Sequence, residues 1–176
     1  MVNNQPRQPA GPTTSPPGWL EEAYRQIDPA LRRYLAAVAG ARGEDLVSQV
    51  WVDATAASER FHGDLAAFRR LVFTIARRRL VDHRRRWWQR RVVLVAELPD
   101  AADGRSWDGS SEAALALIRS LPKAQAEVVF LRVLAGFSAA DVAEITGRSA
   151  QAVRVMQHRA LTALAVTVNS ERDEER

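Results

Sequence analysis

SAADVAEITGRSAQAVRVMQHRAL, residues 138–161, contains two short helical patterns joined by a turn, and this stretch decides the fold of the C-terminal part. Ser138 and Ser149 stand where N-caps are expected, because a serine hydroxyl accepts a hydrogen bond from a backbone N–H of the first turn. Gly147 stands where a helix needs a left-handed residue to end. Helices are therefore predicted over residues 139–146 and about 150–166. Two helices joined in this way have the layout of a helix-turn-helix unit.

The second of these helices has a face that can enter a DNA major groove. Arginine can pair with two acceptors of guanine, and glutamine can pair in the same way with adenine. A plain helical hairpin with a solvated polar face fits the same pattern, and repressors and response regulators also contain this unit. The positions expected to face inward are Val153, Met156, Ala160, Leu161 and Leu164. The positions expected to contact DNA are Ser149, Gln151, Arg154, Val155, His158 and Arg159.

The rest of the chain is also predicted to be helical, so the fold class is all-α. Asp28 is placed to cap a helix whose first turn contains Pro29. A break at Asp28 is therefore expected between this helix and the preceding one. No convincing strand alternation is present, although residues 92–95 fit a brief extended segment. The further helices predicted from apolar periodicity cover about residues 19–27, 29–39, 44–59, 65–90, 111–120 and 122–134.

A stretch without helical periodicity, residues 97–111, separates two small domains. It is rich in Pro, Gly, Asp and Ser, which is typical of a linker, and residues 97–112 hold five acidic residues against one arginine. The first 18 residues contain five of the eight prolines and predict a disordered tail. The expected organisation is a tail at 1–18, helical domains at 19–91 and 111–167, a flexible acidic linker at 92–110, and a charged tail at 168–176.

Charge and composition favour a polyanion partner and exclude several kinds of chemistry. Residues 69–91 contain ten arginines and one acidic residue, Asp82, although a solvated face and codon bias would also produce such a run. The chain has no cysteine, so it has no disulfide and no thiolate metal site. Its histidines are scattered and Lys123 lies in no glycine-rich loop, so neither a metal, a cofactor nor an enzyme activity is expected. Apolar runs are too short to span a membrane and no signal segment opens the chain, so a cytoplasmic location is expected.

Two further blocks narrow the family: GEDLVSQVWVDA at 43–54 and ERFHGDLAAFRRLVFTIARRRLVDHRRR at 59–86. Together they resemble region 2 of extracytoplasmic-function (ECF) sigma factors, group 4 of the sigma-70 family, and residues 114–164 resemble their region 4. The resemblance implies promoter-directed transcription initiation, with core RNA polymerase (its beta and beta-prime subunits), promoter DNA and an anti-sigma factor as partners, and with no small-molecule substrate. An acidic linker in this family can mimic RNA inside polymerase, but the acids can equally keep a linker soluble.

The resemblance also assigns roles to residues of the first domain. Core polymerase would be contacted by Asp45, Leu46, Gln49, Val50 and Trp51, of which Leu46 and Val50 also fit a core stripe. The −10 element would be opened and bound by Phe61, His62, Asp64, Arg77, Arg78, Arg84 and Arg85. The chain departs from the family pattern at Gln49, Leu71 and Arg78, where an acid, a tryptophan and an asparagine are common. The rival functions are a helix-turn-helix regulator that needs no polymerase and a nucleic-acid enzyme.

Overall fold

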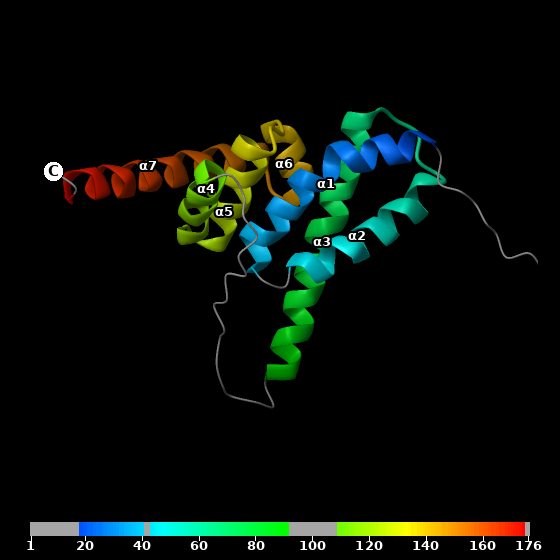
Figure 1. Cartoon of the computed structure of the whole chain (residues 1–176), viewed down its shortest axis with the longest axis horizontal. Helices are drawn as coiled ribbons and strands as arrows, with labels where there is room; N and C mark the ends of the chain where they lie inside the picture. Colours follow the sequence, from blue (N-terminus) through cyan, green and yellow to red (C-terminus); the bar gives the residue numbers. More distant parts are fainter. Residues whose placement is uncertain (1–17, 41–42, 92–108, 175–176) are drawn as a thin grey trace, which may run out of the picture.

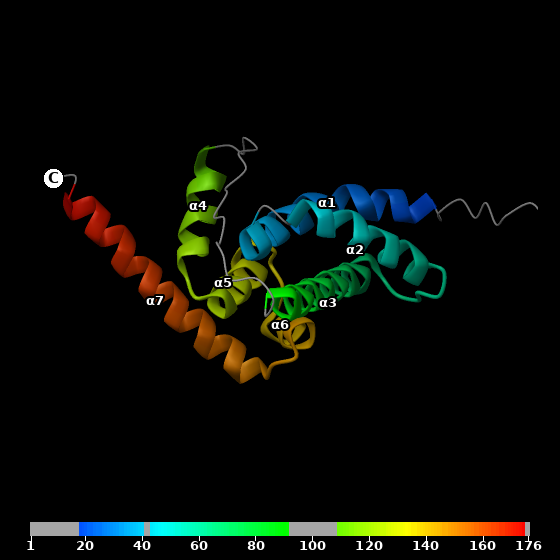
Figure 2. The same cartoon turned by 90° about the horizontal axis from the view of Figure 1, so that it is seen from below.

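The structure is a computed structural model that describes residues 18–40, 43–91 and 109–174, with the backbone alone at 87–91, 109–112 and 171–174. The described residues form seven α-helices and one π-helical turn and contain no strand, which confirms the all-helical prediction. Helices α1 to α3 form an N-terminal bundle, and α4 to α7 form a C-terminal unit beside it (Figures 1 and 2). Within the described ranges, no helix combines the length and the apolar character needed to cross a bilayer.

Helix α1 (Gly18–Ala39) runs unbroken through Pro29, so the prediction of two helices separated at Asp28 was wrong. A proline inside a helix costs about 3 kcal/mol, since it lacks an N–H donor. The apolar stripe continues on both sides of Pro29 and its burial offsets that cost. Asp28 does not act as a cap, because its carboxylate accepts hydrogen bonds from Trp51 Nε1 at 2.8 Å and from Arg32 Nε at 2.6 Å. The buried stripe consists of Leu20, Ala23, Ile27, Leu31, Tyr34, Leu35 and Val38.

Helices α2 (Gly43–Ser58) and α3 (Leu65–Arg91) pack against α1 and against each other. Gly43 permits a close approach of α2 to α1, because a Cβ there would lie 2.7 Å from the backbone carbonyl carbon of Leu35. Arg79 of α3 holds Asp53 of α2 through two hydrogen bonds, and this pairing keeps the pKa of the Asp53 carboxyl below its usual value. The fully buried side chains on α3 are Phe68, Val72, Phe73 and Ala76, with Leu80 nearly so.

The C-terminal unit begins with a helical hairpin and ends in a long helix that projects from the body (Figure 1). The helix predicted over 122–134 changes to π-helical turns over its last five residues, where Ala135 N donates to Phe130 O at 2.9 Å. The last helix reaches Glu174, further than predicted, and includes most of the expected charged tail. The elements are α4 (Gly109–Ser120), α5 (Lys123–Val129), η2 (Phe130–Leu134), α6 (Ala139–Thr146) and α7 (Ala150–Glu174).

The bundle and the C-terminal unit share one hydrophobic core. Phe73 and Phe137 meet edge to face with ring centroids 5.0 Å apart, and Tyr34 meets Phe130 at 5.7 Å. Helix α6 packs on α3, and α5 packs on α1 (Figure 2). The sequence did not predict how the two domains sit relative to each other. Most of the predicted linker and tail, residues 92–108 and 1–17, lies outside the described residues.

Candidate nucleic-acid interface

The turn of the helix-turn-helix unit is built as the sequence predicted. The Ser138 hydroxyl accepts from Asp141 N at 3.0 Å, while the Asp141 carboxylate accepts from Ser138 N, so the two residues form a capping box for α6. Gly147 ends α6 in the left-handed region, with φ 63°. The Ser149 hydroxyl accepts from Ala152 N at 3.1 Å and caps α7. These contacts fix the angle at which α7 leaves α6.

Helix α7 presents the predicted DNA-facing positions to solvent. Val153 and Ala160 are fully buried and Met156 is half-buried, so they anchor the opposite face of α7. Leu161 was expected to face inward but is 41% exposed. A helix turns about 100° per residue, so Leu161 lies off the line that joins Ala160 to Leu164 one turn later. The exposed positions are Ser149, Gln151, Arg154, Val155, His158 and Arg159.

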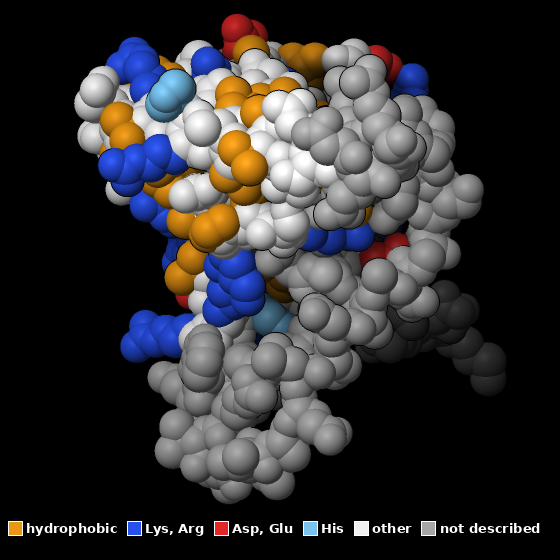
Figure 3. Space-filling model, turned by 90° about the vertical axis from the view of Figure 1, so that its left-hand side faces the viewer, with side chains coloured by type: hydrophobic (Ala, Val, Ile, Leu, Met, Phe, Trp, Pro, Cys, Tyr) orange, Lys and Arg blue, Asp and Glu red, His pale blue; other side chains and the backbone are white. Residues whose placement is uncertain are grey.

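The same side of the molecule combines basic and apolar side chains. Figure 3 shows the side on which α4, α5 and α7 lie, with basic and histidine side chains among hydrophobic ones and few acidic side chains in view. The base of α7 is fixed by Arg132 of η2, whose Nε donates to Gln157 at 2.9 Å and whose Nη1 donates to Phe137 O. A rigid helix with an exposed Gln, Arg and His face suits insertion into a DNA groove.

The loop before α3 places three aromatic rings together, one of which the sequence did not suggest. Phe61 is half-buried, packed against Phe68 at 5.2 Å between ring centroids, while His62 is exposed. The Asp64 carboxylate is exposed but accepts from Ala67 N at 2.7 Å, so it caps α3. Trp19 packs edge to face on Phe68 at 4.8 Å, lies 6.2 Å from Phe61, and stays 42% exposed. Only the folded chain brings Trp19 to this loop, because more than forty positions separate it from Phe61 in the sequence.

Two of the four arginines predicted to hold the −10 phosphates, Arg78 and Arg85, are exposed. They lie on one side of α3, about two turns apart, so that two phosphates of one strand can reach the two guanidinium groups. The charge of Arg78 contributes to the lowered pKa of the Asp53 carboxyl, but that carboxyl is held by hydrogen bonds from Arg79. Arg78 and Arg85 are therefore available to a polyanion.

The other two, Arg77 and Arg84, are occupied by the protein itself. Arg84 Nη2 donates to Val38 O at 2.9 Å, near the end of α1. Arg77 Nε lies 3.3 Å from Glu127 Oε1 of the C-terminal unit, as an ion pair without a hydrogen bond. In this arrangement neither side chain is free to hold a phosphate.

The residues predicted to contact polymerase divide into exposed and buried ones. Asp45 and Gln49 of α2 are exposed. Leu46, Val50 and Trp51 are buried in the bundle core, and the Trp51 ring also packs at a tilt against Tyr24 with centroids 4.7 Å apart. Val52, also on α2, is 69% exposed. Periodicity did not single out Val52, because it breaks the apolar stripe rather than extending it.

Known proteins similar in sequence to this chain identify its family. The family model of sigma-70, region 4, matches residues 111–164, which contain the helix-turn-helix unit. ShbA of Streptomyces griseus, an ECF RNA polymerase sigma factor, is 34% identical over 131 residues, 69% of each chain. SigD of Mycobacterium tuberculosis, another such factor, is 30% identical over 158 residues, 82% of this chain and 74% of that protein.

Two solved structures share the fold. RpoE of Bartonella quintana, solved with the anti-sigma factor NepR, has a TM-score of 0.68 at 22% identity and covers 85% of this chain and 96% of its own. CnrH, solved with the cytosolic domain of CnrY, has a TM-score of 0.59 at 20% identity, with 85% and 87% covered.

The helix-turn-helix unit and the matched relatives thus define the class as sigma-type transcription initiation factors, and those relatives are regulatory proteins rather than classical enzymes. The chain belongs to the ECF RNA polymerase sigma factors, which confirms the resemblance seen in the sequence.

Proposed function

We propose that this chain binds core RNA polymerase, recognises a −35 element with α7, and opens a −10 element with the residue 61–64 loop and α3. The observation that carries the proposal is the face of α7, where Gln151, Arg154 and His158 are exposed while Val153 and Ala160 anchor the helix from behind. Such a helix can place two or three side chains against base edges without losing its own packing.

Opening of the −10 element would use flipped bases and phosphate contacts. The exposed ring of Trp19 and the exposed His62 border the loop, so an unstacked base could find an aromatic surface and a polar edge there. Arg78 and Arg85 would hold the strand on either side. Each phosphate contact adds roughly 0.7 to the logarithmic salt slope for a single strand, so opening should weaken steeply with salt.

Contact with polymerase is assigned to the exposed side of α2. Asp45 and Gln49 supply polar groups, and the exposed Val52 adds an apolar one. Leu46, Val50 and Trp51 would support this surface from the core rather than touch the partner. By likeness to RpoE and CnrH, which were solved with NepR and CnrY, we extend to this chain the proposal of an anti-sigma partner. The chain would act in the cytoplasm with polymerase and needs no cofactor.

Run-off transcription on a pool of genomic fragments tests the proposal. Purified core polymerase should yield discrete new transcripts only when the chain is added. The matched control is the variant Gln151→Ala/Arg154→Ala, which should still bind core polymerase but lose those transcripts, because both residues are exposed and support no packing. A chain that neither binds core polymerase nor yields any new transcript contradicts the proposal, and duplex binding without core binding would indicate an ordinary regulator.

A further inference from the structure

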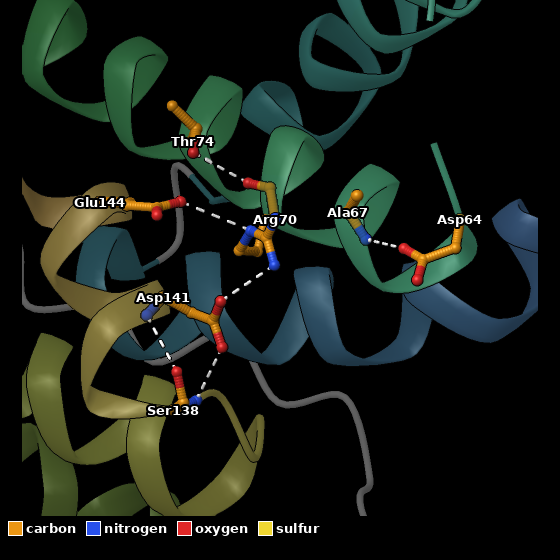
Figure 4. Close-up of polar contacts among 7 residues, drawn as sticks. All are labelled: Asp64, Ala67, Arg70, Thr74, Ser138, Asp141 and Glu144. Atoms are coloured by element: carbon orange, nitrogen blue, oxygen red, sulfur yellow. Dashed lines mark hydrogen bonds and ion pairs between the residues drawn. The ribbon is translucent and has the colours of Figure 1, made fainter. Parts of the chain in front are cut away.

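Acidic side chains of the C-terminal unit cover part of the arginine surface of α3. Arg70 Nη1 lies 3.1 Å from Asp141 Oδ1, and Arg70 Nε lies 3.5 Å from Glu144 Oε2, both on α6 (Figure 4). Lower on α3, Arg77 pairs with Glu127 of α5. The interdomain clasp is the set of these contacts together with that of Arg69, and its members are Arg69, Arg70, Arg77, Glu127, Asp141 and Glu144.

Arg69 belongs to the clasp through its backbone and ring contacts. Its Nη2 donates to Ala135 O, and its guanidinium lies 4.5 Å from the centroid of the Phe137 ring. Burial lowers the pKa of Arg69 from its usual value. Both contacts come from the segment between η2 and α6, so this side chain is covered by the C-terminal unit as well.

The clasp combines a buried anchor with exchangeable pairs. We call the packing of the C-terminal unit on the N-terminal bundle the closed arrangement. In it Glu127 is 6% exposed and accepts a hydrogen bond from Tyr34, and the charge of Arg77 lies beside it, so the carboxylate is compensated. The pairs of Arg70 are different, because the Glu144 side chain is 71% exposed and water reaches it. Ion pairs of this exposed kind are weak and compete poorly with a polyanion at low salt.

A guanidinium held by a carboxylate cannot hold a phosphate at the same nitrogen atoms. Carboxylates hold Arg70 and Arg77, two turns apart on α3, and the Ala135 carbonyl holds Arg69, while Arg78 and Arg85 remain exposed. We propose that the C-terminal unit masks the arginine surface of α3 from single-stranded DNA, and that the strand and the acidic face of the unit compete for it. This inference rests on the proposed function in that a DNA strand is the ligand of α3.

The first experiment follows the closed arrangement directly. Because the chain has no cysteine, Ser48→Cys on α2 and Ala116→Cys on α4, both at exposed positions, allow one donor and one acceptor dye to be attached. Saturation with a short single-stranded DNA of random sequence should lower the energy transfer between the dyes. Strand binding with unchanged energy transfer would overturn the masking.

The second experiment weakens the clasp without changing shape. In the variant Asp141→Asn/Glu144→Gln the asparagine oxygen can still accept from Ser138 N and keep the cap of α6. This variant should bind the single strand about three- to tenfold tighter than the native chain, as expected from the loss of two partly exposed pairs. The control variant Glu22→Gln/Glu44→Gln removes the same charge from exposed residues outside the clasp and should change affinity less than about twofold.

Equal affinities of the clasp and control variants would overturn the inference. The same preparations are used in run-off transcription, so a failure of the masking inference can be distinguished from a failure of the proposed function. If the transcripts appear but strand affinity does not rise, masking alone fails; if strand affinity rises but no transcript appears, the proposed function fails and masking stands.

Discussion

Tyr34 of α1 donates a hydrogen bond of 2.9 Å to Glu127 of α5, and both side chains are buried where the N-terminal bundle meets the C-terminal unit. Neither group could be buried alone at low cost, since a carboxylate needs compensating partners in an apolar region. The Tyr34 hydroxyl therefore supports the burial of Glu127, together with the charge of Arg77.

Replacing Tyr34 by phenylalanine should cost about 1–3 kcal/mol of unfolding free energy, because Glu127 loses a donor inside the core. Urea denaturation measures the loss. In the Glu127→Gln background the same change should cost less, since the neutral amide tolerates the missing donor better than a carboxylate. Tyr24→Phe is the control, because Tyr24 is exposed. Equal losses for the two tyrosine variants would contradict the assigned role of the contact.

Stability should also fall at alkaline pH through the same residue. Burial raises the pKa of Tyr34 well above its usual value of 10.0, and the charge of Glu127 raises the pKa further. The folded chain therefore keeps a proton that the unfolded chain loses near pH 10, so this contribution is present below that pH and disappears as the pH rises through the folded pKa. Unfolding free energies measured from pH 8 upward, roughly to pH 11, should fall more steeply for the native chain than for Tyr34→Phe. Parallel curves for the native chain and Tyr34→Phe would contradict this role of Tyr34.

Alanine at Gly43 should lower stability by about 1–3 kcal/mol, because a Cβ would meet backbone atoms that cannot move aside. The nearest are the carbonyl carbon and oxygen of Leu35, at 2.7 and 2.8 Å. Gly18→Ala serves as the matched control, since nothing lies within 4 Å of a Cβ there, and it should be neutral or slightly stabilising. Thermal melts of the two variants check this, and a shared melting temperature would show that α1 and α2 can separate without cost.

Changing Trp19 to alanine should weaken opening of the −10 element by about 1–3 kcal/mol, the usual effect of removing an aromatic surface from beneath a base. Permanganate reactivity of unpaired thymines in the polymerase complex measures the opening. Trp19→Phe should recover most of it, because a ring remains on Phe68. Binding of duplex −35 DNA is the internal control and should not change. If both variants open promoters as the native chain does, Trp19 has only a packing role.

Arg154→Ala should change preference among −35 sequences by about 1–3 kcal/mol at one base pair, with a smaller effect on total DNA affinity. Competition among duplexes that differ at single positions measures this. Arg119 on α4 lies outside the helix-turn-helix unit, so Arg119→Ala should leave the preferences unchanged. A uniform loss for Arg154→Ala on every duplex would mean that the side chain contacts only phosphate.

The sequence predicted local structure well wherever one side chain decides it. Ser138, Gly147 and Ser149 were each assigned the cap or turn that the structure contains, because capping depends on residues within one helical turn. The break at Pro29 was wrong for the opposite reason. A proline signal is local, whereas the burial that keeps α1 continuous depends on helices distant in the sequence.

The sequence predicted which residues belong to the candidate interface better than it predicted how those residues are paired. The run of arginines on α3 indicated a polyanion partner. Nothing in the sequence, however, paired Arg70 with a carboxylate of α6, Arg77 with one of α5, or Arg79 with Asp53. Charge density identifies a surface, but pairing depends on which residues the tertiary fold brings within about 4 Å. Trp19 was missed in the same way, because its neighbours at the loop are distant in the chain.

The π-helical turn at Phe130–Leu134 sets the rotational phase of everything after it. A π turn adds one residue to an α-helical path, and one residue corresponds to about 100° around the helix axis. Removal of a single residue there would let α5 continue as an ordinary helix and would swing α6 and α7 around by that angle. The acidic residues of α6 would then no longer face α3. Mutational drift can therefore change side chains across this segment far more easily than it can change the segment's length.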